Sequence, residues 1–344
     1  MSKMNKNVLK PDPSGTATAR TPEQIKAARR EASRKFLFGS ADKRGLLGSI
    51  VIYVLLITIA FIYLYPMLYM LSRSLMGKAD LLDTSVKWIP SAINFKNYTD
   101  AMLVMDYWPS LYKNLVLALV PTLAQVLICS MVGYGFARYN FPGKMVWMGI
   151  LILSFLLPTQ TTSLPNYLLF ANWKLADGSV KPFLITAILG QGFKSALCIL
   201  IFWNFHNQVP KSLTEAAEID GAGHLYSYFR IAVPLSTAAI VVVTLFSFVW
   251  YWNETYLVRE YLGREAISNR SIGLTTLMIE LSKFDSSYSA ASAASAGGST
   301  SVDKMSEAMK MAGTMLAILP MLILYFVLQK QFVESVDRAG ITGE

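Results

Sequence analysis

The feature that most limits the fold is a set of five long windows without any charged residue. Each window encloses between 19 and 29 residues, and a helix of about 20 residues crosses the hydrocarbon core of a bilayer. Charged residues make up only 15% of the chain, against about 25% in a soluble globular domain. The chain is therefore expected to cross a membrane several times. The windows lie between Arg44 and Arg73, Lys113 and Arg138, Lys144 and Lys174, Arg230 and Glu254, and Lys310 and Lys330.

A sixth span is expected between Lys181 and Lys211, where an apolar stretch is interrupted by Lys194. The expected fold class is therefore an all-α membrane protein with six transmembrane helices and one short cytoplasmic helix between the fourth and the fifth. The six helices are expected at residues 48–71, 114–137, 146–170, 184–206, 231–253 and 312–332.

Lysine and arginine gather on one side of these spans, and this bias sets the expected orientation. Residues 1–47 contain eleven of them against four acidic residues, and the loop at 138–145 contains two cations and no acid. The long connection at 254–311 has six cations and seven acids, so it shows no cationic bias. Both termini are therefore expected in the cytoplasm, and residues 254–311 are expected outside it.

The expected organisation is a basic cytoplasmic tail over 1–45, a six-helix domain over 46–333 and a cytoplasmic tail over 334–344. In the N-terminal tail, residues 21–39 allow either a short helix lying on anionic lipid or an unstructured tail. The Ser/Ala-rich segment 286–301 of the outer loop is expected to be mobile, because small polar residues cannot form a core.

Several classes of function find no support in the sequence. No folded basic module that would bind nucleic acid is recognisable. The fragment GQGFKS at 190–195 lacks the spacing of a phosphate-binding loop, and no catalytic set of side chains is present. The two histidines, His206 and His224, are far in sequence from Cys129 and Cys198 and give no metal-ligand spacing. We therefore expect no enzyme activity, no metal and no cofactor on this chain.

A polar elbow, SLTEAAEIDGAGHLYSYFRIAVP at 212–234, separates two apolar stretches. Ser212 as N-cap and Glu215 three residues later form a capping box, which predicts a short helix on the cytoplasmic side. Asp220 and Gly221 predict its end, because glycine adopts the left-handed conformation without a Cβ penalty. The short helix, with its terminating turn, is expected over residues 212–222.

The spacing within this elbow resembles the EAA signature of bacterial ABC-importer permeases. EAA at 215–217 is followed after three residues by Gly221, and after nine more by IAVP at 231–234. The family pattern is EAA, three residues, Gly, nine residues, Ile, any residue, Leu, Pro, so only Val233 departs from it. Over residues 48–344 the chain resembles the maltose-type MalG subunit, whose fold is MetI-like. Further similar fragments are YGFARYNFPG at 134–143, LPTQ at 157–160 and LPNY at 164–167.

The resemblance implies a permease subunit of an ATP-driven importer of di- or oligosaccharides in a bacterial inner or plasma membrane. The implied partners are a second homologous permease, two ATPase subunits that bind ATP and Mg²⁺, an extracytoplasmic solute-binding protein facing 254–311, sugar and membrane lipid, but no nucleic acid. Two alternatives stay open. One is a permease for another solute, such as polyamine or phosphate. The other is an autonomous secondary carrier, for which only Lys194 would serve as a midplane ion-coupling group.

In this resemblance the elbow is a coupling helix that docks in a cleft of an ATPase subunit. Glu215 would pair there with a cation, although it could instead only cap its own helix, and Gly221 would supply the sharp turn. The implied ATPase-coupling residues are Glu215, Ala216, Ala217, Asp220, Gly221 and Ala222.

Polar residues within the third and fourth spans are candidates for the translocation path, because polar groups at membrane depth commonly line a cavity. Hydrogen bonds between helices, and snorkelling of Lys194 to the surface, are the alternatives. The aromatic residues at 250–252 allow either stacking on sugar rings or an interfacial belt. The candidates are Thr159, Gln160, Thr162, Asn166, Gln191, Lys194 and Trp252.

Overall fold

The structure is a computed structural model. It describes residues 37, 39–40, 43–83, 85, 88–176, 178–192, 194–261, 275–295 and 302–341. Most of the segment 21–39, for which a lipid-bound helix or an unstructured tail was predicted, lies outside the described residues, as do residues 296–301 of the Ser/Ala-rich segment.

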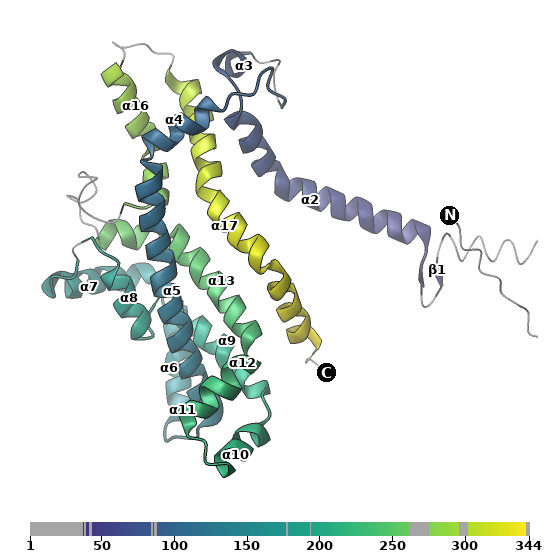
Figure 1. Cartoon of the computed structure of the whole chain (residues 1–344), viewed down its shortest axis with the longest axis vertical. Coiled ribbons are helices and arrows are strands. Elements are labelled where there is room, and N and C mark those ends of the chain that lie inside the picture. Colours follow the sequence, from purple (N-terminus) through teal and green to yellow (C-terminus); the bar gives the residue numbers. More distant parts are fainter. Residues whose placement is uncertain are drawn as a thin grey trace, which may run out of the picture. The chain divides into compact units, whose positions relative to one another are not determined.

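The described chain is helical apart from one two-residue strand pair, so the all-α expectation holds with that small exception (Figure 1). Strand β1 (Gly39–Ser40) pairs antiparallel with β2 (Lys43–Arg44). The helices are α2 (Leu46–Ser74), α3 (Lys78–Leu82), α4 (Lys96–Val104), α5 (Tyr107–Arg138), α6 (Lys144–Leu156), α7 (Thr159–Asn172), α8 (Lys181–Ile188), α9 (Ser195–Gln208), α10 (Lys211–Ile219), α11 (His224–Ser227), the π-helix η1 (Tyr228–Ala232), α12 (Val233–Leu235), α13 (Thr237–Asn253), α15 (Leu277–Ser282), α16 (Phe284–Ser295) and α17 (Val302–Ile341).

Three described helices are long and apolar enough to cross a membrane unaided, and the number rises to five if each of two bent pairs is one span. The three are Leu46–Ser74, Tyr107–Arg138 and Glu307–Gln331. One bent pair is α6 with α7, at 98°, and the other joins His224–Leu235 to Thr237–Asn253 at 79°. The described helices agree with a multi-pass helical membrane protein, and two of the candidate spans are bent pairs of helices.

Three of the helices predicted as continuous are interrupted. The one predicted over 231–253 bends by 79° at Ser236, between α12 and α13, and the other two are broken for local reasons. The prediction over 146–170 becomes α6 and α7, because Pro158 between them has an extended ψ of 137° and cannot donate a backbone hydrogen bond. The prediction over 184–206 becomes α8 and α9. Between these helices Gly190 and Lys194 have positive φ angles of 70° and 53°, which a right-handed helix cannot contain.

Part of the Ser/Ala-rich segment is helical, because Phe284–Ser295 form α16, while the mobility predicted for 286–301 stays a prediction. Alanine has the highest intrinsic helix propensity of all residues, so an alanine-rich segment needs little core to become helical. Lys310 of α17 forms an ion pair with Asp285 in the first turn of α16, at 2.5 Å.

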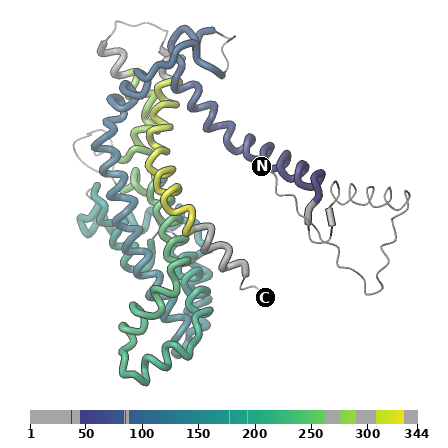
Figure 2. The backbone as a smooth tube through the Cα atoms, turned by 45° about the vertical axis from the view of Figure 1, so that its right-hand side comes forward, coloured from purple at the N-terminus to yellow at the C-terminus, as the bar shows by residue number. Residues whose placement is uncertain are grey.

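The chain divides into two units, residues 1–68 and residues 69–344. The second unit is built around α5, which packs against α8, α9 and α13, while α13 also packs against α17 (Figure 2). A close approach between α5 and α9 is possible at Gly133, where a Cβ atom would lie only 2.7 Å from Cβ of Phe202. Small residues allow such close helix contacts in membrane proteins.

Candidate functional site: an exposed elbow and two adjoining pockets

The elbow contains the short helix α10, but the helix begins two residues earlier than the capping box predicts. Its first residue is Lys211, its N-cap is Pro210, and no side chain caps it. Ser212 therefore lies inside the helix, and the N-cap role predicted for it is wrong. A proline lacks an N–H group and has a fixed φ, so it can precede a first turn without any capping side chain.

The end of α10 follows the prediction from Asp220 and Gly221. Gly221 has a φ of +82°. The N–H of Ala222 donates to the carbonyl of Ala217 at 2.8 Å, and the N–H of Gly221 donates to that of Glu218 at 3.0 Å. These two bonds are the pair that defines a Schellman ending, with glycine at the left-handed position.

The residues predicted to couple to an ATPase form an accessible surface. Glu215, Ala216, Asp220 and Gly221 are exposed, while Ala217 and Ala222 are half-buried. An open hollow of about 400 Å³ lies beside the turn. Ile219 projects from the end of α10 with 87% of its surface exposed. The hollow is lined by Ala217, Asp220, Gly221, Ala222, Gly223 and Tyr226.

The two ends of the elbow are anchored to the helical core by polar contacts. The guanidinium of Arg138, at the end of α5, donates to the carbonyl of Val209 at 2.8 Å, just before α10 begins. After the elbow, Nδ1 of His206 lies 3.0 Å from the hydroxyl of Ser236, the residue at the 79° bend. The hydroxyl of Ser130 lies 3.4 Å from Nε2 of the same ring.

His206 is therefore the centre of a buried cluster that joins α5, α9 and the bend before α13. It is fully buried. Its ring stacks on Phe202 and meets Tyr134 edge to face at 5.4 Å. Tyr134 also contacts Tyr228 of η1, the segment that leaves the elbow. The cluster gives a continuous packed connection from the elbow to the core.

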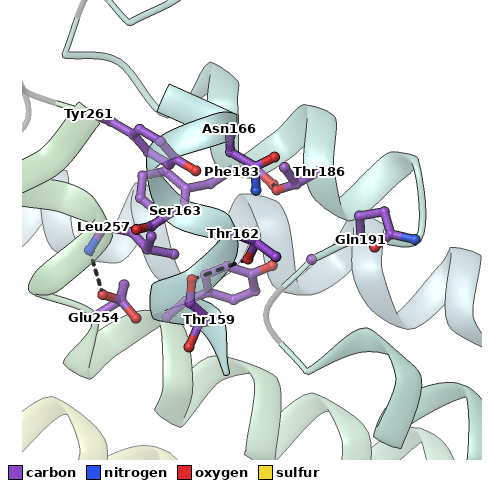
Figure 3. A pocket seen from close by; sticks show the side chains of 12 residues that line it. Thr159, Thr162, Ser163, Asn166, Phe183, Thr186, Gln191, Glu254, Leu257 and Tyr261 are labelled. Atoms are coloured by element: carbon purple, nitrogen blue, oxygen red, sulfur yellow. Dashed lines mark hydrogen bonds between the residues drawn. The ribbon is translucent and has the colours of Figure 1, made fainter. Parts of the chain in front are cut away.

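Farther along the bundle, polar side chains from three segments surround a small cavity of about 60 Å³ (Figure 3). We call it the Glu254 pocket. Helix α7 contributes hydroxyl and amide groups, α8 contributes Phe183 and Thr186, and the segment beginning at Tyr251 closes the other side. The lining residues are Thr159, Thr162, Ser163, Asn166, Phe183, Thr186, Gln191, Gly192, Tyr251, Glu254, Leu257 and Tyr261.

The backbone break between α8 and α9 forms one side of the pocket. Gly192, in this break, packs closely against a hydrogen bond between two core side chains. The hydroxyl of Tyr251 donates to Oε1 of Gln125 at 2.7 Å. A Cβ atom at Gly192 would lie 2.7 Å from both of these oxygen atoms. Only a residue without a side chain fits there undisturbed, so the broken backbone approaches the core closely at this point.

Buried aromatic rings form the back wall of the Glu254 pocket. Phe183 meets Tyr261 and Tyr251 edge to face, with ring centroids 5.3 and 6.4 Å apart. Burial and, to a lesser extent, the carboxylates of Glu260 and Glu254 raise the pKa of Tyr261 to about 12. Its phenol is thus a neutral hydrogen-bonding group at physiological pH.

Glu254 is the one carboxylate in this lining, and it follows directly after α13. It is only 9% exposed. One of its oxygens accepts a hydrogen bond from the N–H of Leu257 at 2.8 Å, which caps the helical turn at 256–261. Figure 3 shows the second oxygen directed away from this bond. Burial raises the pKa of the Glu254 carboxyl, while the N–H groups of Leu257 and Tyr256 lower it to a smaller extent.

A second and larger pocket, the Lys194 pocket, adjoins the first and has a volume of about 370 Å³. The two share Thr159, Thr162, Gln191 and Gly192 as lining residues. Gln160 and Lys194 line only the larger one. The ammonium group of Lys194 lies over the ring of Trp250, 4.9 Å from its centroid.

The structure brings six of the seven predicted path residues to these two pockets. The seventh, Trp252, is fully buried and stacks on Phe248 in the hydrophobic core. Its neighbour Tyr251 faces the Glu254 pocket instead. Sequence reasoning did not single out Glu254 or Tyr261, because no signal in the chain places the end of α13 beside α7 and α8.

Broken helical spans around polar pockets, together with an exposed elbow that ends in a Schellman turn, define the class: a membrane transport subunit rather than an enzyme. The family described as binding-protein-dependent transport system inner membrane component matches residues 125–338. This range covers more than half of the chain. The chain belongs to this family and is the permease component of an ABC importer of the MalG type.

Relatives match most of the chain. It is 31% identical to the osmoprotective compounds uptake permease protein GgtD of Synechocystis, covering 62% of this chain and 73% of that one. It is 26% identical to the maltodextrin transport system permease protein MdxG of Bacillus subtilis, covering 88% and 100%. A solved structure of a bacterial ABC transporter involved in import of the acidic polysaccharide alginate has the same fold, with a TM-score of 0.65, 23% identity, and coverage of 83% and 96%.

Proposed function

We propose that this chain is one of two transmembrane subunits in an ATP-driven, binding-protein-dependent importer of di- or oligosaccharides. Membership of the permease family carries this proposal. Relatives named for maltodextrin and for arabinooligosaccharides support a sugar as the substrate. The polar pockets agree with it, because hydroxyl and amide groups suit a ligand rich in hydroxyl groups.

The proposed topology keeps six crossings in a bacterial inner or plasma membrane, with both termini in the cytoplasm. Two broken crossings are formed by α6 with α7 and by α8 with α9. The proposed domain limits remain 1–45, 46–333 and 334–344. The loop 254–311 would face an extracytoplasmic binding protein. Irregular backbone at membrane depth is tolerated where it lines a cavity, which supports counting the broken helices as spans.

The proposed coupling step runs through the elbow. Glu215 is exposed and makes no capping bond, so its carboxylate is available to pair with a cation of an ATPase subunit. The short side chains of Ala216, Ala217 and Ala222 would let the surface of an ATPase subunit approach closely beside the hollow. Asp220 and Gly221 form the turn at the end of the helix. Movement of a docked ATPase would reach the core through the His206 cluster. Each partner must prefer one state of the permease for this to drive alternating access.

The remaining partners follow from the same proposal. A second homologous permease would complete the translocation path, and ATP with Mg²⁺ would bind to two separate ATPase subunits rather than to this chain. Thr159, Gln160, Thr162, Asn166, Gln191 and Lys194 would form this chain's part of the path. Trp252 is kept out of direct ligand contact in this conformation by its burial.

Reconstitution tests the proposal. The chain would be assembled in proteoliposomes with the second permease, the ATPases and the binding protein whose genes adjoin its own, and uptake of labelled oligosaccharides would be measured. Uptake is expected only with ATP and binding protein together. Uptake that persists without the ATPase subunits would favour the secondary carrier, and transport of polyamine or phosphate in place of sugar would favour the other permease class.

A further inference from the structure

We propose that the Glu254 pocket holds the uncharged, hydroxyl-bearing end of a sugar residue and that Glu254 rejects a carboxylate group at that position. The inference rests on the proposed sugar import and narrows its substrate class to neutral oligosaccharides. Glu254 is then a specificity-determining residue, and the ring carrying the hydroxyl group would lie in the adjoining Lys194 pocket.

The size of the two pockets supports this division. The Glu254 pocket has a volume of about 60 Å³ and is the smaller of the two. The smaller pocket suits a substituent such as a hydroxymethyl or a carboxylate group. The adjoining pocket of about 370 Å³ has room for the ring, and the two share Thr159, Thr162, Gln191 and Gly192. The smaller pocket can therefore discriminate between substituents of a sugar ring that is bound in the larger pocket.

The neutral part of the lining offers groups that bind hydroxyls. The hydroxyls of Thr162, Ser163 and Thr186 donate to backbone carbonyls of their own helices at 3.0–3.1 Å. The oxygens of Thr162 and Thr186 keep the capacity to accept another hydrogen bond, whereas the Ser163 hydroxyl also pairs with that of Tyr256 at 3.2 Å. The amides of Asn166 and Gln191 add donors and acceptors. None of the described lining residues of this pocket is Lys, Arg or His.

Glu254 adds charge discrimination to this set. The N–H groups of Leu257 and Tyr256 both act on its carboxylate, and an ionised carboxylate uses its remaining lone pairs only to accept hydrogen bonds. A sugar hydroxyl can donate to it in a strong charge-assisted bond. A uronate carboxylate would add a second negative charge next to Glu254 and has no proton to donate to it. None of the described lining residues of this buried pocket is a cation that would offset the two charges. Such a pair of buried like charges is strongly unfavourable.

Lys194 does not cancel this effect at the Glu254 pocket. It lines only the larger pocket, and its ammonium group is placed over the ring of Trp250. Gly192, one of the four residues that line both pockets, lies close against the side chains of Tyr251 and Gln125. Glu254 is thus the only charged side chain among the described lining residues of the smaller pocket, and the carboxylate of Glu260, which acts on Tyr261, adds charge of the same sign.

The test measures protection of a cysteine at the shared rim of the two pockets. Thr162→Cys would be introduced into the complete transporter in proteoliposomes, where the native Cys129 and Cys198 are buried. The labelling rate by a small thiol reagent would be measured with maltotriose, arabinotriose or trigalacturonate, in the wild-type background and with Glu254→Gln. The glutamine keeps an oxygen for the Leu257 N–H, so the helix cap is preserved while the charge is lost. Glu280→Gln is the matched control, because Glu280 is buried but does not line the pocket.

Neutral trisaccharides are expected to protect the cysteine, and trigalacturonate is expected to need a concentration about tenfold higher or more, as like-charge repulsion predicts. Glu254→Gln should largely remove that difference, and Glu280→Gln should retain it. Equal protection by neutral and acidic sugars without the substitution, or an unchanged ratio in Glu254→Gln, overturns the inference. If Thr162→Cys prevents assembly, Gln191→Cys at the same rim replaces it.

Uptake of the same labelled sugars separates this inference from the proposed function. If ATP-driven uptake of sugar is intact and no neutral sugar protects the cysteine, the pocket assignment is overturned and the importer proposal stands. If no sugar is taken up by the complete transporter, the importer proposal fails, whatever the protection experiment shows.

Discussion

Glu254 carries a carboxylate into a place where burial penalises its charge. The pKa of this carboxyl is raised above its ordinary value by burial, although backbone N–H groups offset part of the effect. A raised pKa means that the folded protein binds the proton more tightly than the unfolded chain does. The ionised form therefore lowers the free energy of unfolding at neutral pH. A stability cost retained at a buried carboxylate is common at positions that serve function.

Glu254→Gln is therefore expected to raise the thermal unfolding midpoint of the assembled transporter at pH 7. The gain should shrink as the pH falls through the pKa of Glu254, because protonation then removes the same charge from the unsubstituted protein. Tyr261, with a pKa of about 12, stays protonated over this range. Thermal scans at pH 7 and near pH 5 provide the measurement. A lower midpoint at pH 7, or a gain that grows in acid, would contradict the account.

The polar residues of α7 could be predicted from the sequence, but Glu254 could not. Thr159, Thr162 and Asn166 form part of a polar run inside an uncharged window, and such a run at membrane depth indicates a cavity. Glu254 ends a window of the same kind, so it looks like the edge of a span. The choice between Tyr251 and Trp252 was also beyond the sequence, because successive residues of an entirely apolar helix differ only in the direction they face.

At the scale of elements, the elbow shows that the sequence signal for the end of a helix is more reliable than the signal for its start. The end of α10 was predictable because a left-handed residue strongly favours glycine, and Gly221 takes that conformation. The start was not, because Pro210 leads directly into the first turn and Ser212 has no capping bond to make. An N-cap residue is one of several ways to begin a helix, so its signal is weaker.

Two neighbouring glycines allow a matched test of the turn. Neither Gly221 nor Gly223 has any atom near the position of an added Cβ, but only Gly221 has a positive φ. Gly221→Ala should therefore strain the turn by about 1–2 kcal/mol and lower the amount of sugar imported per ATP hydrolysed. Gly221→Asn should be milder, because asparagine visits this conformation. Gly223→Ala should behave like the unsubstituted protein.

Sugar uptake and ATP hydrolysis are measured on the same proteoliposomes, and their ratio gives the amount of sugar imported per ATP hydrolysed. Equal losses for Gly221→Ala and Gly223→Ala would show that the left-handed turn has no part in coupling. The stronger change Gly221→Asp should leave the subunit in the membrane and uncouple transport from hydrolysis, and normal uptake by that variant would contradict the coupling role.

The two histidines differ in burial, and this difference predicts different effects of substitution. His206→Leu leaves the hydroxyls of Ser130 and Ser236 without their partner in the core, at an expected cost of about 1–3 kcal/mol in unfolding free energy. His224 is exposed and forms only a surface contact with Glu218, so His224→Leu should change it by less than about 0.5 kcal/mol. Thermal denaturation of the two variants compares them directly, and equal effects would argue against the buried cluster.

At the scale of the whole molecule, uncharged windows predicted a multi-pass membrane protein, but they could not predict its broken spans. The window between Lys144 and Lys174 is uniform in charge, yet Pro158 divides it into two helices at 98°. The break between α8 and α9 depends on left-handed backbone at Gly190 and Lys194, fitted against the core at Gly192. Such a break is stabilised by tertiary contacts, so hydropathy alone does not reveal it.

The central claim is that the elbow lies in the cytoplasm and receives the ATPase. The most direct measurement labels Ile219→Cys, at a position that is 87% exposed, with a membrane-impermeant thiol reagent. Labelling is expected in inside-out vesicles that lack the ATPase subunits, not in right-side-out vesicles, and it should be suppressed when the ATPase subunits are bound. Labelling from the outer side, or labelling that bound ATPase subunits leave unchanged, would contradict the account.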